Sequence, residues 1–496
     1  MNLPSRRVGI TAAIVAFAAL QMVPAALNGY PLLFFDTRAY YNSGEAALGF
    51  ALGRFGEDAP WGATGAPGSA AGAPGGAAGG AEPANASALE EIGAERSDLS
   101  FSRSPYYGAV LYLLFSLSPF AVVAAQALAL AGVAWLTVRA LVPDRAVAAY
   151  LSAGAICAAV TPLPYFAGYL MPDVFAAVVP LGVFLLAYGW RELSVGERLL
   201  VWLLLSASLV FHTSHIILAA GLVAVTAGAA LWPGLRPVGR GWLVAGLALG
   251  AAILGVVVFE QAIRTVFGVS PVNPPYLTAR GLEDGPVAAM IREGCPGHDF
   301  AVCAADPEEN AESQQFLWGT AGFYAAGDDA TRLRLSEEDF SVFFTAAAER
   351  PLDQLAASLR NTAIQFGMFG LYDFDTVPRV LAQSAPHYLP PDEVPAFARS
   401  DAAQGRLPLD ALSLAVYAAA IAGALVLGAL ALAGRLGRRT AAVLLVVAAA
   451  LIGNAIAGGA LSDAHHRYQA RLIWLVPFLA AVLGVHAVTG RVRRSA

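Results

Sequence analysis

Lysine is absent from this chain of 496 residues, and all 30 basic residues are arginine. Charged residues make up only 13% of the sequence, against about 25% in ordinary soluble domains. This scarcity of charge excludes a cytosolic enzyme, a nucleic-acid binder and a disordered chain. Apolar residues make up 57% instead, which predicts an all-α polytopic membrane protein whose helices are surrounded by lipid.

Apolar runs predict about ten transmembrane helices, because each crossing takes roughly 17–25 apolar residues. The runs lie near 8–29, 119–141, 146–163, 174–190, 198–211, 216–232, 242–266, 409–433, 440–458 and 471–489. The first run has no small-residue cleavage site, so we interpret it as an anchor and not a signal peptide.

Arginine placement predicts the topology. On one side, 14 arginines lie in short segments: Arg6, Arg7, Arg139, Arg145, Arg191, Arg198, Arg236, Arg240, Arg435, Arg438, Arg439, Arg491, Arg493 and Arg494. The positive-inside rule makes this side and both termini cytoplasmic. The opposite, outer side would face the periplasm of a bacterial inner membrane. Among its short loops, only the last carries arginine, at Arg467 and Arg471.

We divide the chain into a membrane part, 1–266, an outer segment, 267–408, and three final spans in 409–496. The first outer loop, 30–118, contains a low-complexity insertion at 59–88 and then an apolar stretch, 106–117, that is too short to span. We expect that stretch to form a helix along the outer interface. In the second outer segment, 336–350 and 352–366 have the pattern of amphipathic helices. Cys295 and Cys303 are predicted to form a disulfide in an oxidising compartment, and Cys157 to be a packing residue.

Unusual polar residues gather at the outer ends of the predicted spans. Asp36 follows the first span, Arg103 precedes the interfacial stretch, and Asp173 precedes the fourth span. His212 and His215 lie at the turn between the fifth and sixth spans. The last outer loop adds Asp463, His465, His466, Arg467 and Arg471. Ionisable groups at the membrane boundary are costly unless they line a wet cavity, so we expect one functional site there.

Simpler interpretations of these residues stay open at this point. Asp36 is also compatible with an interfacial charge, and Asp173 with a helix N-cap. The stretch 212–215 is compatible with a polar turn or, at its i, i+3 spacing, with a metal pair that lacks a local third ligand. The last loop is compatible with a solvated loop.

In their order along the chain, these residues resemble the GT-C superfamily of membrane glycosyltransferases, which includes protein mannosyltransferases and the lipid A aminoarabinose transferase. The matching stretches are 34–41 (Phe-Phe-Asp-Thr-Arg-Ala-Tyr-Tyr), 102–107 (Ser-Arg-Ser-Pro-Tyr-Tyr), 171–175 (Met-Pro-Asp-Val-Phe), 212–215 (His-Thr-Ser-His) and Arg467-Tyr468. Two features depart from the family: fewer spans, and an outer segment placed before the last three spans.

The resemblance implies an inverting glycosyltransferase that moves a sugar from a polyprenyl-phosphate donor to a lipid, glycan or protein of the envelope. Asp36 would be the catalytic base, and Asp173 would orient the acceptor or hold a divalent cation; no cofactor is certain. Arginine suits the donor phosphate because its planar fork donates two hydrogen bonds at once, so Arg467, Arg471 and Arg103 fit that role, with Arg471 expected to help hold the phosphate. The expected substrate-binding residues are Tyr40, Arg103, His212, His215, Asp463, His465, His466, Arg467, Tyr468 and Arg471.

Three rival functions are weighed against this interpretation. An O-antigen-type ligase or polymerase also has a late outer loop with arginine and histidine, but it does not need an aspartate directly after the first span. A transporter or flippase would place paired charges near the bilayer midplane or show an inverted repeat, and Glu260 has no counterpart of this kind. An assembly scaffold leaves the one-sided clustering unexplained.

Overall fold

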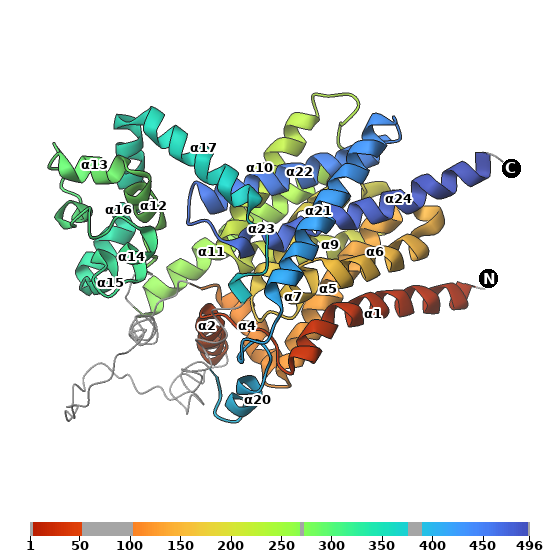
Figure 1. Ribbon diagram of the computed structural model, residues 1–496, viewed down its shortest axis with the longest axis horizontal. Helices are drawn as coiled ribbons and strands as arrows, with labels where there is room; N and C mark the ends of the chain where they lie inside the picture. The colour runs from red at the N-terminus through yellow and green to blue at the C-terminus, as the bar shows by residue number, and fades with distance from the viewer. Residues whose placement is uncertain (1–2, 52–102, 268–271, 375–388, 495–496) are drawn as a thin grey trace.

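A computed structural model describes residues 3–51, 103–267, 272–374 and 389–494 (Figure 1). Within these ranges every regular element is a helix, apart from one isolated parallel bridge between Leu32 and Tyr169. The predicted all-α class is therefore confirmed. The insertion 59–88 lies outside the described residues.

Six helical runs in the described part are long and apolar enough to cross a membrane. They are α1 (Leu3–Asn28), α5 (Pro119–Leu141), α11 (Gly241–Phe267), α21 (Leu409–Leu432), α22 (Arg438–Gly459) and the run of α23 (His466–Ile473) with α24 (Leu475–Arg494). The protein therefore has the character of a helical membrane protein.

At the other four positions where the sequence predicts spans, the helices are shorter. These are α6 (Ala146–Val160), η2 (Pro172–Ala177) leading into α8 (Val178–Ala187), α9 (Val195–Phe211) and α10 (Thr213–Ala229), and the α-helices among them have 10 to 17 residues. Prolines at 162, 164 and 172 interrupt regular α-helix between α6 and α8, because proline cannot donate a backbone hydrogen bond. The count of about ten spans stays a prediction.

Both termini lie at one end of the helical bundle, and we call the opposite end the distal end (Figure 1). A helical unit, which we call the distal unit, extends from that end between α11 and α21. It contains α12 (Tyr276–Asp284), α13 (Pro286–Arg292), η4 (Ala301–Ala304), α14 (Ser313–Trp318), α15 (Phe323–Ala326), α16 (Asp329–Glu349) and α17 (Pro351–Gly367). The smaller elements elsewhere are η1 (Pro143–Arg145), α7 (Leu163–Ala167), η3 (Trp190–Glu192) and α20 (Val394–Ala398).

The distal unit has a hydrophobic core of its own, around Val287, Phe316 and Val342. The predicted disulfide between Cys295 and Cys303 is present within it, and Cys157 is a buried free cysteine as expected. The two predicted amphipathic helices correspond to α16 and α17. The first begins earlier than the sequence pattern indicated, because the Asp328 carboxylate accepts a hydrogen bond from the Thr331 amide and caps the helix.

Backbone hydrogen bonds bring two distant segments together at the distal end. The amide of Leu32 donates to the carbonyl of Gly168 at 2.8 Å, and the amide of Leu170 donates to the carbonyl of Leu32 at 2.9 Å. The Thr37 hydroxyl also donates to the Leu170 carbonyl at 3.3 Å. These contacts place the start of α2 (Asp36–Ala51) beside the start of η2.

The predicted interfacial stretch forms α4 (Pro105–Phe115), which packs tightly on α2. The two backbones nearly touch at Gly44 and Gly108: a Cβ on Gly44 would lie 2.0 Å from the Gly108 carbonyl oxygen. Only glycine permits so close an approach. The helix pair that carries Asp36 and Arg103 is held at this crossing.

Gly44→Ala is expected to destabilise the protein by about 1–3 kcal/mol, because the added methyl group must push α2 away from α4. Gly49→Ala is the matched control in the same helix, since a Cβ there meets nothing within 4 Å. Thermal unfolding of the purified protein in detergent measures both. An equal midpoint for the two variants would show that the glycine crossing does not constrain the helix pair.

Candidate active site

Asp36 and Arg103 form an ion pair at the distal end, with Arg103 Nη2 and Asp36 Oδ1 2.6 Å apart. Asp36 is the first residue of α2, and Arg103 lies two residues before α4. Both side chains keep about a fifth of their surface exposed. Burial alone would lower the pKa of Arg103, but the neighbouring Asp36 carboxylate raises it well above its ordinary value. Arg103 is therefore a permanent cation at a partly exposed position.

Asp173 and Arg471 form a second ion pair at 3.3 Å, and only 2–3% of either side chain is exposed. The Arg471 guanidinium also donates to Ser214 Oγ at 3.1 Å and to Asn454 Oδ1 at 2.9 Å. Asp173 Oδ2 and Arg471 Nε are buried without a hydrogen-bond partner in the described part of the chain. The alternative of Asp173 as a helix cap is wrong, because the N-cap of η2 is Met171 and no side chain caps that turn.

Arg467 lies among aromatic rings. Its guanidinium carbon lies 4.0 Å from the Phe34 ring centroid and 5.0 Å from that of Tyr468. Among the described residues, no carboxylate comes within ion-pair distance of this guanidinium. Its backbone amide donates to Asp373 Oδ2 at 2.8 Å, which fixes the residue without neutralising the side chain at close range. The Arg467 guanidinium can therefore bind an anion, while its contacts with the two rings hold the side chain in place.

Tyr40 lies near the carboxylates of both ion pairs. Its side chain is buried, and its ring packs edge-on against Tyr107 with centroids 5.2 Å apart. Burial raises the pKa of Tyr40 most; Arg103 and Arg467 lower it, while Asp36 and Asp173 raise it. All four charged groups thus act on one hydroxyl. Arg467 also lies over the Phe34 ring, and Thr37 bonds the Leu170 carbonyl, so the predicted residues from four separate segments form one cluster.

His212 and His215 face this cluster from the start of α10. His212 is the N-cap of α10, where its Nδ1 accepts a hydrogen bond from the Ser214 amide at 3.2 Å. Burial lowers the pKa of His212 well below its ordinary value, and His215 and three arginines lower it further, so the ring is neutral. His215 is fully buried, with Nδ1 2.7 Å from the Ser208 carbonyl oxygen. The described residues contain no group of three possible metal ligands, so a local metal pair gains no support.

The rest of the last loop turns toward the distal unit. Asp463 accepts a hydrogen bond from Gln314 at 3.0 Å and lies 3.7 Å from Arg280. The backbone of His465 bonds the Gln365 side chain through both its amide and its carbonyl. His466 Nδ1 accepts a hydrogen bond from the Gly370 amide at 3.0 Å. These contacts contradict the alternative of a freely solvated loop and give Asp463 and the two histidines structural partners.

Three residues that sequence reasoning missed also belong to this region: Tyr276, Asp373 and Asn454. Burial raises the pKa of Tyr276, and Arg103 and Asp36 act on it most among the charged groups, so α12 of the distal unit borders the exposed ion pair. Asn454 also donates to the Gln469 side chain at 2.9 Å. A lone asparagine inside the apolar run 440–458 was a signal that could have been used. Nothing in the local sequence marks Tyr276.

An apolar cavity of about 180 Å³ lies beside the cluster, between helices of the bundle. Its walls come from α4, α5, α9 and η2: Tyr107, Val110, Leu114, Val122, Ala125, Gln126, Ala129, Phe175, Leu204, Ala207 and Phe211. Tyr107 connects it to the cluster through its contact with Tyr40. A polar, mostly cationic site thus adjoins a space suited to a hydrocarbon chain.

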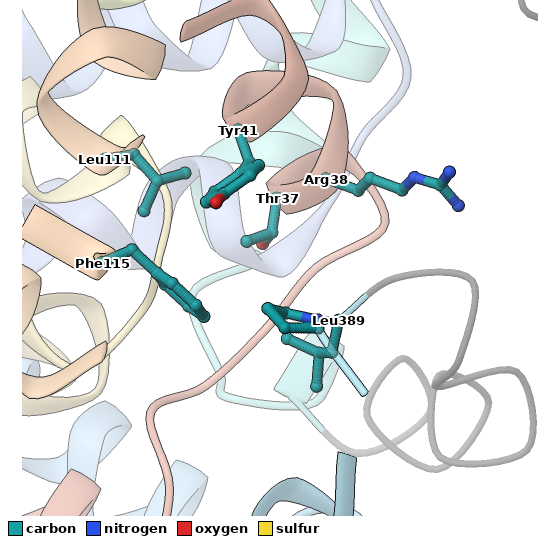
Figure 2. Close-up of a pocket in the computed structure, with 7 residues that line it drawn as sticks. Thr37, Arg38, Tyr41, Leu111, Phe115 and Leu389 are labelled. Carbon is teal, nitrogen blue, oxygen red and sulfur yellow. The ribbon is translucent and has the colours of Figure 1, made fainter. Parts of the chain in front are cut away.

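A second, smaller hollow lies between α2 and α4, with Tyr41 in its wall (Figure 2). Thr37, Leu111, Phe115 and Leu389 line it, and the Arg38 side chain points away from them toward the surface. It contains none of the residues of the charged cluster.

Comparison of the whole chain with protein-family models, curated proteins and solved structures finds no match.

Proposed function

We propose that the protein is a membrane glycosyltransferase of the GT-C type, which transfers a sugar from a polyprenyl phosphate to an acceptor at the outer face of a bacterial inner membrane. The observation that carries the proposal is the joining of two unlike surfaces. A cluster of three arginines and two aspartates adjoins an apolar cavity within a bundle of membrane helices. A lipid-linked sugar phosphate has the same two parts, a charged head and a hydrocarbon tail.

Asp36 is the group best placed to act as the base. An acceptor hydroxyl must reach the base, and Asp36 is about a fifth exposed, whereas Asp173 is almost fully buried. Arg103 binds Oδ1 of Asp36, and within the described part of the chain Oδ2 is the oxygen that we assign to the acceptor. In the reaction, the acceptor oxygen forms a bond to the anomeric carbon as the bond from that carbon to the phosphate oxygen breaks. The acceptor proton passes to Asp36, and the leaving polyprenyl phosphate carries away the negative charge.

Arg467 is the best candidate for the phosphate ligand. Both Nη atoms of Arg471 already bind Asp173, Ser214 or Asn454, so that side chain is committed to the protein. Among the described residues, the Arg467 guanidinium has only ring contacts and a weak 3.4 Å hydrogen bond to the Tyr468 hydroxyl. A leaving phosphate beside it would gain a charge-assisted pair of hydrogen bonds. The apolar cavity would hold the first isoprene units of the donor.

The proposed orientation follows the arginine bias of the sequence. Both termini lie at one end of the bundle and the charged cluster lies at the other (Figure 1). Cytoplasmic termini would therefore direct the cluster outward, toward periplasmic acceptors.

Arg467→Lys is expected to raise the KM for the donor by roughly tenfold to a hundredfold, because lysine keeps the charge but loses the fork that binds two oxygens. Arg292→Lys is the matched control, since Arg292 is an exposed arginine paired with Glu308 in the distal unit. The assay follows transfer from polyprenyl-phosphate-linked hexoses and pentoses in membranes with matched protein levels. If the wild-type protein consumes no donor of this class, the proposed function fails. If the wild-type protein transfers the sugar and Arg467→Lys keeps the wild-type KM for the donor, the phosphate assignment fails.

A further inference from the structure

Helix α17 is amphipathic in the reverse sense to a water-soluble helix. Gln354, Asn361 and Gln365 share its protein-facing side, and each is at most 7% exposed. The opposite side carries Leu352, Leu355, Leu359 and Phe366, which are 77%, 55%, 63% and 44% exposed. The spacing of three, four and seven residues aligns these four side chains on one face, which we call the α17 stripe. Water would disfavour both sides of this arrangement.

Specific hydrogen bonds fix the rotation of α17 about its axis. Gln354 and Asn361 both donate to the buried carboxylate of Asp284, at 2.9 and 2.7 Å. Gln365 bonds both backbone groups of His465 at the distal end of the bundle. Turning the α17 stripe inward would break all four of these hydrogen bonds. The hydrogen bonds of the polar face therefore keep the α17 stripe facing outward.

The neighbour of α17 is a membrane helix. The Asn361 carbonyl approaches Gly459 so closely that a Cβ there would lie 2.4 Å from it, and α17 packs along the distal half of α22. That half of α22 also exposes Ile452 and Ile456. From this contact α17 runs away from the bundle toward the rest of the distal unit (Figure 1). The stripe thus begins where the apolar surface of a candidate span ends.

We propose that α17 lies in the outer surface of the bilayer, with the α17 stripe inserted among lipid acyl chains. Lipid is the occupant that the structure favours, because the stripe continues the lipid-facing surface of α22 and because reversed polarity is the pattern of a helix in an apolar solvent. The 17 residues of α17 span about 25 Å, enough for a long contact with the headgroup and acyl boundary. The distal unit is then a membrane-seated part of the protein, and not a soluble segment tethered by two linkers.

This seating would also support the charged cluster. Gln365 holds His465, which lies two residues before Arg467. The bilayer would therefore fix the last loop through α17, whatever reaction the cluster performs. The lipid contact and the proposed chemistry can fail separately, because one is measured by accessibility and the other by transfer.

Single nitroxide labels test the proposal in the full-length protein. The native cysteines do not interfere, since Cys157 is buried and the other two form a disulfide. Labels are placed at Leu355→Cys and Leu359→Cys in the α17 stripe. Ile452→Cys on α22 is the lipid-facing control, and Glu308→Cys, whose native side chain is 76% exposed, is the aqueous control. Relaxation by molecular oxygen and by a water-soluble nickel chelate is measured in nanodiscs of phosphatidylethanolamine and phosphatidylglycerol.

The expected result is that both stripe labels resemble Ile452→Cys, with high oxygen and low nickel accessibility. Nickel accessibility as high as at Glu308→Cys would place the stripe in water and overturn the proposal. Low accessibility to both reagents would mean that protein covers the stripe, which also overturns it. Thermal midpoints close to that of the unlabelled protein would show that the labelled variants fold, and Leu352→Cys supplies a third stripe position if one variant does not.

Discussion

Asp36→Asn is expected to lower the rate of sugar transfer by about a hundredfold or more, the usual effect of losing a general base. Asparagine keeps the size of the side chain and can still contact Arg103, so folding and donor affinity should change little. The expected signature is a fall in kcat with a nearly constant KM for the donor. Initial rates in membranes with matched protein levels measure it.

The control for this variant is Asp329→Asn, which removes a carboxylate that is 85% exposed on the distal unit and should leave the rate unchanged. Wild-type transfer by Asp36→Asn would refute the base assignment. Asp173 would then be the next candidate, because its Oδ2 is buried without a partner among the described residues. Asp173→Asn in the same assay separates the two carboxylates.

Arg471→Met is expected to destabilise the folded protein by about 3–5 kcal/mol, because it leaves the buried Asp173 carboxylate without its cation. Methionine retains much of the length and volume of the side chain, so the cost arises from charge more than from a cavity. Thermal unfolding in detergent should show a clear fall in the midpoint. The double variant Asp173→Asn with Arg471→Met should recover much of that loss, since it removes both charges of the pair.

This pair of variants also distinguishes a structural role for Arg471 from a direct one. Our sequence-based prediction gave Arg471 the donor phosphate, whereas its contacts with Asp173, Ser214 and Asn454 favour a role in holding the site together. If Arg471→Met unfolds at the wild-type temperature and still loses transfer, the phosphate role returns. If the stable double variant transfers sugar, Arg471 acts only through the fold.

Composition predicted the helical class, and the polar residues at span ends predicted which segments meet. Asp36, Arg103, Asp173 and Arg471 could be found in this way because a charge beside an apolar run is conspicuous. Their pairing could not be, since one pair depends on the close crossing of α2 and α4 and the other on the packing of α23 against η2. Neither contact leaves a pattern in the sequence around the charges. The sequence also could not distinguish Arg467 from Arg471, which are four residues apart and differ only in what surrounds them.

In the distal unit, the sequence pattern predicted a helix but not which of its faces is buried. The apolar pattern of 352–366 correctly predicted an amphipathic helix, and the ordinary assumption that apolar residues face inward would have placed it the wrong way round. Only the partners of Gln354, Asn361 and Gln365 reveal which side is inside. Periodicity gives the two faces of a helix, whereas the solvent that each face meets is a property of the whole assembly.

The parallel bridge between Leu32 and Tyr169 should make the site tolerant of side-chain exchange at these positions but sensitive to insertions and deletions next to them. Its bonds join main-chain atoms, so exchanging the side chains at these positions leaves the spacing of the two carboxylates intact. Gaining or losing one residue between Leu32 and Asp36 would shift that carboxylate by about 3.3 Å relative to the bridge. We therefore expect homologous proteins to keep the number of residues in this short stretch while the residue types change.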